Sequence, residues 1–65
     1  MIKRILRKRL RRDIATYIGA TNPEYEDVFN WVYNAPIWNW NVMKTCVIQS
    51  YSLREAKKLY AFFCK

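Results

Sequence analysis

The chain begins with an apolar side chain at every fourth position, and this period constrains the fold more than any other feature. The residues that form the repeat are Ile2, Leu6, Leu10, Ile14 and Ile18. On an α-helix this spacing makes one apolar stripe, which Ile5 and Tyr17 widen. Gly19 follows directly, and glycine adopts without steric cost the left-handed conformation that often ends a helix. The sequence therefore predicts an amphipathic helix over residues 2–18.

A second helix is predicted by a start signal at Asn22-Pro23-Glu24. Asn caps a helix, Pro suits the first helical position because its missing N–H is not needed there, and an acid stabilises the first turn. The apolar spacing stops before Pro36, since proline disfavours helical geometry in the residue that precedes it. We expect this helix over residues 23–33.

The C-terminal half of the chain predicts two more helices. Residues 37–50 are apolar around the whole circumference of a helix, which is typical of a buried one. The alternation over 38–42 also suits a strand, but we find no second strand to pair with it. Residues 52–64 start with a capping box, in which the Ser52 hydroxyl and the Glu55 carboxylate each accept a free backbone N–H.

Together these elements predict an all-α fold, a compact bundle of about four short helices, in a single domain that spans 1–65. A chain of 65 residues is long enough for one domain only. One Gly and two Pro supply little of the turn chemistry that a chain of short β-strands needs. Apolar residues make up 52% of the chain, so material for a core is ample.

The net charge of +7 is segregated along the chain. Residues 1–12 carry seven cations and no acid, residues 13–43 carry four acids and no Lys or Arg, and residues 44–65 carry five cations and one acid. The first group lies on the polar face of the predicted first helix and consists of Lys3, Arg4, Arg7, Lys8, Arg9, Arg11 and Arg12. A local imbalance of this size exceeds what solubility needs.

Cations at this density match the phosphate backbone of a nucleic acid, where each contact releases condensed counterions and strengthens binding. We therefore expect a protein that docks on nucleic acid or on a nucleoprotein assembly through these residues, with Lys57 and Lys58 extending the surface. Alternatively, these cations bind no partner: they form a solvated face that keeps the protein soluble, or they pair with the acids of the second helix. A helix-turn-helix is disfavoured, because its recognition helix would carry only Lys44 and its partner helix would bring three acids toward the phosphates.

Aromatic side chains give a second signal. Trp31, Tyr33 and Trp38 belong to residue types that are enriched at binding hot spots, although they also fill cores. We expect Trp40 and Phe29 inside, and Trp38 or Trp31 at least half exposed. Exposed aromatics suit an inhibitor or adaptor that occludes a protein partner with an acidic surface, and a homodimer is a further alternative.

Catalysis and cofactors are not expected. The chain has no His, its two cysteines cannot complete a structural zinc site, and no Gly-rich phosphate loop occurs. Ser50 and Ser52 have no candidate base. Without extracellular context, Cys46 and Cys64 are expected to be reduced and partly buried. The sequence thus predicts a binding protein that is not an enzyme and holds neither a metal nor another cofactor.

The expected location is the cytoplasm, for a soluble protein. No segment approaches the ~20 apolar residues of a membrane span, and the cationic N-terminus lacks the apolar run of a signal peptide. An interfacial membrane helix over 1–12 and an Arg-rich transit peptide over 2–18 are alternatives, but both would remove the first helix from a small fold. The scarcity of Gly, the abundance of Asn, Tyr, Ile and Lys and the short length resemble small accessory proteins encoded by phages.

Overall fold

The computed structural model describes the backbone of residues 2–64 and the side chains of residues 3–64, so the side chain of Ile2 lies outside the described part. Every regular element in that range is a helix. The elements are α1 (Ile2–Ile18), α2 (Tyr25–Tyr33), the short 3₁₀ helix η1 (Ile37–Asn39), α3 (Trp40–Ile48) and α4 (Leu53–Phe63). The predicted all-α bundle is confirmed, and so is a helix instead of a strand after residue 37.

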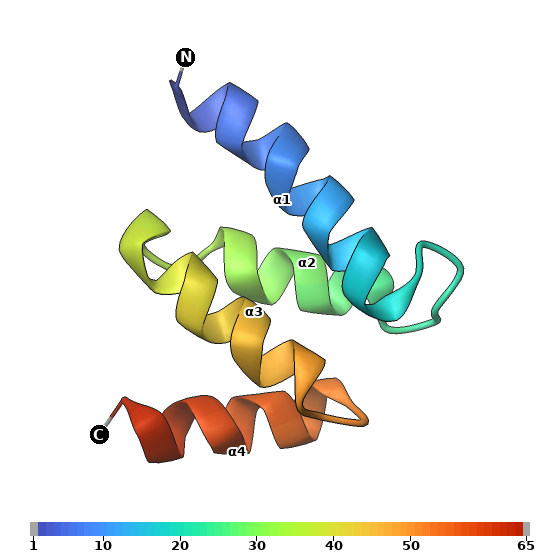
Figure 1. Ribbon diagram of the computed structural model, residues 1–65, viewed down its shortest axis with the longest axis vertical. Helices are drawn as coiled ribbons and strands as arrows, with labels where there is room; N and C mark the ends of the chain where they lie inside the picture. Colours follow the sequence, from blue (N-terminus) through green and yellow to red (C-terminus); the bar gives the residue numbers. More distant parts are fainter. Residues whose placement is uncertain (1, 65) are drawn as a thin grey trace.

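The helices are arranged with α1 and α4 at opposite edges of the molecule and with α2 and α3 between them (Figure 1). All of the α-helices contribute to one core, but α3 contributes most and α4 least. The buried residues are Leu10, Ile14, Val28, Phe29, Val32, Trp40, Met43, Cys46, Val47 and Ala56. The central position of α3 agrees with its apolar circumference, because a helix that packs on neighbours along several faces needs apolar residues on all of them.

The apolar stripe of α1 is only partly buried. Leu10 and Ile14 are buried, and Leu6 and Ile18 are half-buried against the same core. Ile5 is an exception to the prediction, because it is 60% exposed. Its place in the sequence puts it one residue before Leu6, and one helical residue turns the side chain by about 100° away from the stripe.

The segment after Pro36 is helical but divided. Pro36 is extended, with φ −56° and ψ 142°, and η1 makes one turn before α3 begins. The first buried side chain is that of Trp40, whose indole Nε1 donates a hydrogen bond to the Ala35 carbonyl oxygen at 3.1 Å. The indole therefore contributes apolar area to the core while its polar N–H stays satisfied.

The predicted helix ends are largely confirmed. Gly19 has φ 83°, the left-handed conformation expected after α1. α2 starts at Tyr25, two residues later than predicted, because the turn before it closes through the Tyr25 N–H and the Asn22 carbonyl at 3.0 Å. The predicted Asn22 cap is wrong, because Glu24 is the N-cap residue of α2, and the Asn22 Oδ1 accepts the Glu24 N–H at 2.8 Å within the turn before the helix.

The capping box at the start of α4 forms with one change. The Ser52 hydroxyl accepts the Glu55 N–H at 3.3 Å, as predicted. The Glu55 carboxylate accepts the N–H of Tyr51 at 3.0 Å, one residue before the expected donor. Both bonds still satisfy backbone groups at the entry to α4.

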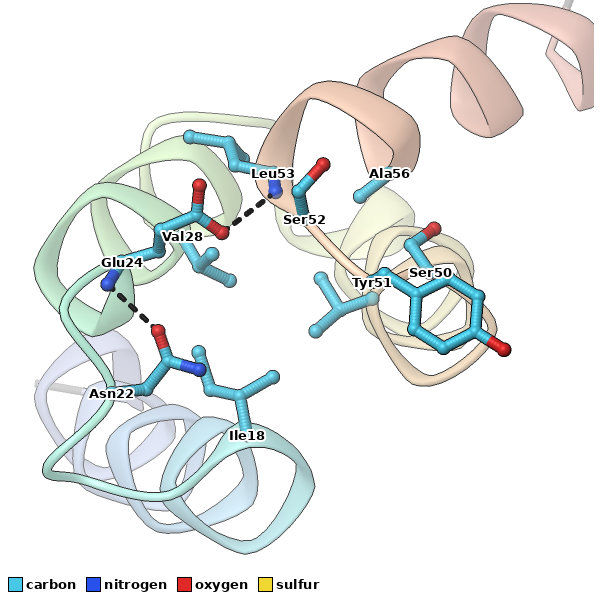
Figure 2. Close-up of a pocket in the computed structure, with 10 residues that line it drawn as sticks. Ile18, Asn22, Glu24, Val28, Ser50, Tyr51, Ser52, Leu53 and Ala56 are labelled. Atoms are coloured by element: carbon cyan, nitrogen blue, oxygen red, sulfur yellow. Dashed lines mark hydrogen bonds between the residues drawn. The ribbon is translucent and has the colours of Figure 1, made fainter.

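A longer-range contact also caps α4. The Glu24 carboxylate, at the entry to α2, accepts the Leu53 N–H at 3.0 Å (Figure 2). This places a negative charge at the positive end of the α4 dipole and joins segments that are 29 residues apart. Because α4 buries only Ala56 fully, this polar contact is important for holding the helix in place.

We expect Glu24→Ala to lower the free energy of unfolding by about 1 kcal/mol, because the variant leaves the Leu53 N–H without its acceptor. In urea this corresponds to a midpoint lower by about 1 M for a small domain. Asp27→Ala is the matched control, since it removes the same charge from an exposed position in α2. Equal shifts in the two variants would show that charge, and not the α4 cap, is responsible.

Candidate nucleic-acid interface

The seven cations of α1 fall into two rows and one single residue. Lys3, Arg7 and Arg11 make up the inner row, which faces the aromatic side chains of α2. Arg4, Lys8 and Arg12 make up the outer row, and all of them are exposed. The four-residue spacing within each row places its members one above the other along the helix. Arg9 lies on the other flank, at a groove between α1 and α3.

The inner row meets an equally regular row on α2. Tyr25, Phe29 and Tyr33, here called the aromatic row, stack with ring centroids 6.4 Å and 5.6 Å apart and interplanar angles of 13° and 12°. The Tyr25 hydroxyl donates to the Arg11 carbonyl oxygen at 3.2 Å, which ties the start of α2 to the middle of α1. Phe29 is 1% exposed, so this row is part of the packing between the two helices.

Each member of the inner row lies over a ring of the aromatic row. The guanidinium carbon of Arg11 is 4.1 Å from the Phe29 centroid, and that of Arg7 is 5.1 Å from the Tyr33 centroid. The Lys3 ammonium is also 5.1 Å from the Tyr33 centroid. These distances lie within the range of cation–π attraction, in which the electron-rich ring face stabilises the cation without neutralising it. The inner row therefore stabilises the α1–α2 contact and keeps its charge.

The acids of the chain neutralise little of this surface. Glu26 pairs with Arg11 at 3.6 Å, and both side chains are largely exposed. Asp13 pairs instead with Lys44 of α3, at 2.8 Å and mostly buried. Among the described residues, no ion pair forms to the outer row or to Arg9. Pairing with the acids of α2, the alternative explanation for the cations, thus applies to Arg11 alone.

The structure does not bring Lys57 and Lys58 together with the cations of α1. Both lysines are exposed on α4, and α4 lies at the opposite edge of the molecule from α1 (Figure 1). Arg54 is exposed on the same helix. The chain therefore presents separate cationic surfaces on α1 and on α4.

The predicted aromatic cluster is divided as well. Trp31 packs edge-to-face on Tyr60 of α4, with centroids 5.9 Å apart, and Tyr33 contacts the rings of Phe29 and Trp40. Only Trp38, on η1, is largely free, at 80% exposed. The expectation that Phe29 and Trp40 lie inside and that Trp38 lies at the surface is confirmed.

Tyr17, Tyr51, Phe62 and Phe63 are exposed aromatic residues that were not predicted as part of a surface. Phe62 and Phe63, at the end of α4, are 71% and 59% exposed and contact each other edge-to-face. Phe63 also lines a shallow groove with Val42 of α3. Phe63 follows Ala56 and Tyr60 at the helical spacing of core positions, yet it is exposed at the last residue of α4.

The remaining polar groups serve the fold. The small pocket in Figure 2 lies where the end of α1, the entry to α2 and the loop before α4 meet. The side chains of Asn22, Glu24 and Ser52 accept the backbone N–H groups already described, and the Ser50 hydroxyl donates to the Cys46 carbonyl oxygen. Within residues 2–64 no three His, Cys, Asp or Glu side chains gather closely enough to hold a metal.

The cysteines differ from one another. Cys46 is a buried free thiol and Cys64 is an exposed one, so the prediction of partial burial is wrong for both. Burial raises the pKa of the Cys46 thiol, with a smaller contribution from the nearby Cys64. A thiol with a raised pKa carries little thiolate at neutral pH and is a poor nucleophile. Cys46 is accordingly a core residue.

Comparisons with protein families, with curated proteins and with solved structures found no match to this chain. None of the described helices combines the length and the apolar character that crossing a membrane requires. A function is therefore inferred from the arrangement of charge and aromatic side chains.

Because the inner row contacts α2 and the outer row does not, substitutions at the neighbouring residues Arg11 and Arg12 should affect stability unequally. Arg11→Gln removes the contact with Phe29 and the weak pair with Glu26, and we expect it to destabilise the fold by about 1 kcal/mol. For a domain of this size the melting temperature should fall by about 4–8 °C. Arg12→Gln makes the same change of charge on the exposed outer row and should leave the melting temperature within about 2 °C. A thermal melt followed by circular dichroism compares them, and equal melting temperatures would contradict the structural role of Arg11.

Proposed function

We propose that this protein binds nucleic acid, alone or within a nucleoprotein assembly, through the cations of α1, and that it does so without catalysis. The proposal depends on the state of four cations, namely the outer row and Arg9. These cations are exposed on one helix and form no ion pair within the described chain. Their charge is thus available to an anionic partner, and the density of charge on a nucleic acid rewards such contacts through counterion release.

The position of α1 supports this proposal. α1 forms an edge of the molecule, and its N-terminal half extends past the other helices (Figure 1). From Arg4 to Arg12 the outer row extends about 12 Å along the helix axis, at about 1.5 Å per residue. A long polyanion can therefore lie along the outer row at this edge.

The inner row adds two guanidinium groups whose positions are restricted. Arg7 and Arg11 lie over the rings of Tyr33 and Phe29, and these contacts limit the rotamers that the long side chains adopt. A guanidinium over a ring retains N–H donors at its edge, and these donors fit two phosphate oxygens at once. Since less side-chain entropy is lost on binding, a restricted arginine contributes more affinity than a mobile one.

The proposal places this binding in the cytoplasm. The composition also predicts an accessory or regulatory role like that of small phage proteins. The proposed binding of nucleic acid does not depend on this prediction.

Salt dependence and a charge-matched pair of variants test the proposal. The affinity for nucleic acid should fall steeply with salt, and Arg4→Gln/Lys8→Gln/Arg12→Gln should reduce the logarithmic slope by up to about 2.7, at about 0.9 per duplex phosphate lost. The control is Arg54→Gln/Lys57→Gln/Lys58→Gln, which makes the same change of net charge on α4. We expect the control to retain most of the slope. Fluorescence anisotropy with a labelled oligonucleotide from 50 mM to 200 mM salt is the measurement.

Two outcomes would contradict the proposal. A flat salt response of the unmodified protein would exclude a phosphate-backbone interaction of this kind. Equal losses in the two triple variants would show that net charge, and not the α1 surface, determines binding. All of the substituted residues are exposed, so circular dichroism should confirm that both variants fold.

A second candidate function is an inhibitor or adaptor that binds a protein partner through Trp38. The observation in its favour is the exposure of this indole, together with exposed Phe62 and Phe63 elsewhere on the surface. A large exposed aromatic side chain is a common anchor in protein interfaces. In this case the basic α1 would meet an acidic surface of the partner.

Trp38→Ala distinguishes this candidate. Because Trp38 is exposed, its removal should change the free energy of unfolding by less than about 0.5 kcal/mol. Trp31→Ala should destabilise the fold by about 2 kcal/mol or more, since it removes the packing on Tyr60. A pull-down with nuclease treatment and high-salt washes then compares the unmodified protein with Trp38→Ala. A partner that survives both treatments and is lost only in the variant would favour this second function.

A further inference from the structure

Resting on the proposed function, we infer that α1 binds the phosphate backbone of a nucleic-acid double helix and not the unpaired bases of a single strand. The distinction follows from how the aromatic row and the cations of α1 are placed. It narrows the partner to duplex DNA or duplex RNA, which share this chemistry.

The aromatic rings nearest the cations are already occupied. Proteins that hold single strands combine a cationic groove with aromatic faces on which successive bases stack. Here the rings of the aromatic row stack on one another, and Lys3, Arg7 and Arg11 lie over the faces of Phe29 and Tyr33. A base would have to displace an arginine, and with it a contact between α1 and α2, before it could stack there.

The shape of the surface also fits a duplex. The outer row projects from the outward side of α1, with Arg7 and Arg11 on the flank toward α2 and Arg9 on the flank toward α3. The outer row lies on the side of α1 that faces away from the groove lined by Arg9, whereas a single-strand site is itself a groove. A helix with its side chains is about 10–12 Å across, close to the width of about 12 Å of the B-form major groove. Cations on both flanks can then reach phosphates of both strands.

Trp38 is a feature beside this surface that could favour a single strand. It is exposed, and its neighbour Ile37 lines the groove between α1 and α3 beside Arg9. An exposed indole near cations is able to stack on an unpaired base. Trp38→Ala therefore separates the two kinds of partner, because a duplex leaves this side chain unused.

The experiment measures the anisotropy of four labelled oligonucleotides of equal length and sequence: a DNA duplex, an RNA duplex and the corresponding single strands. Each is titrated with the unmodified protein, with Trp38→Ala and with Arg4→Gln/Lys8→Gln/Arg12→Gln. We expect at least one duplex to bind about tenfold more tightly than its single strands, with a salt slope of about −0.9 per contact. Trp38→Ala should leave duplex affinity within about twofold, while the triple variant should lower it at least about tenfold. Which duplex is bound more tightly identifies the natural source of the backbone.

Tighter binding of a single strand, with that advantage lost in Trp38→Ala, would overturn the inference and leave the proposed function standing. Equal affinity for duplex and single strand would also overturn it. Failure of all four oligonucleotides to bind a folded protein at low salt would overturn the proposed function itself. Circular dichroism of each variant provides the check on folding.

Discussion

The contact between the inner row of α1 and the aromatic row of α2 is the interaction on which the remaining structure depends. It favours one rotation of α1 about its own axis, the one that keeps Lys3, Arg7 and Arg11 over the rings of Phe29 and Tyr33. That rotation directs Leu10 and Ile14 into the core and the outer row away from it. If α1 were rotated about its axis by about 100°, the angle between successive residues, its cations would be buried and its apolar stripe would be exposed. Packing and the direction of the charged surface are therefore set together.

The same contact reduces the cost of placing so many like charges on one helix. Seven cations in the first turns of α1 repel one another, and cations near a helix N-terminus also oppose the helix dipole. The ring faces of Phe29 and Tyr33 offset part of this repulsion, at about 0.5–2 kcal/mol per contact. Within the described part of the chain, an acid pairs with these cations at Arg11 alone, and the Glu24 carboxylate caps α4 instead. Aromatic rings are suited to this task because they stabilise the cations without removing the charge.

The bounds of α1 and the start of α4 were predictable because they depend on neighbours in the sequence, whereas α2 starts two residues later than predicted and the helix predicted over 37–50 is divided into η1 and α3. The four-residue period, Gly19 and the Ser52 cap are local signals, and the structure confirms each of them. The division of the cations was not predicted, because it depends on which side of α1 the second helix packs. A matching four-residue spacing was nevertheless present, in Lys3, Arg7 and Arg11 and again in Tyr25, Phe29 and Tyr33. The position of Lys57 and Lys58 could not be read in this way, because it follows from how α3 and α4 pack in three dimensions.

The outer and inner rows also differ in how freely their residues can change. Arg4, Lys8 and Arg12 contribute little to packing, so substitution there alters the charge that a partner meets and leaves the core intact. Arg11 cannot be changed so simply, because its guanidinium lies over the most deeply buried ring of α2. Effects of two substitutions should combine additively only where the residues share no contact, and within the inner row Arg7 and Arg11 share the Phe29 ring. The outer row is therefore where binding can be examined apart from folding.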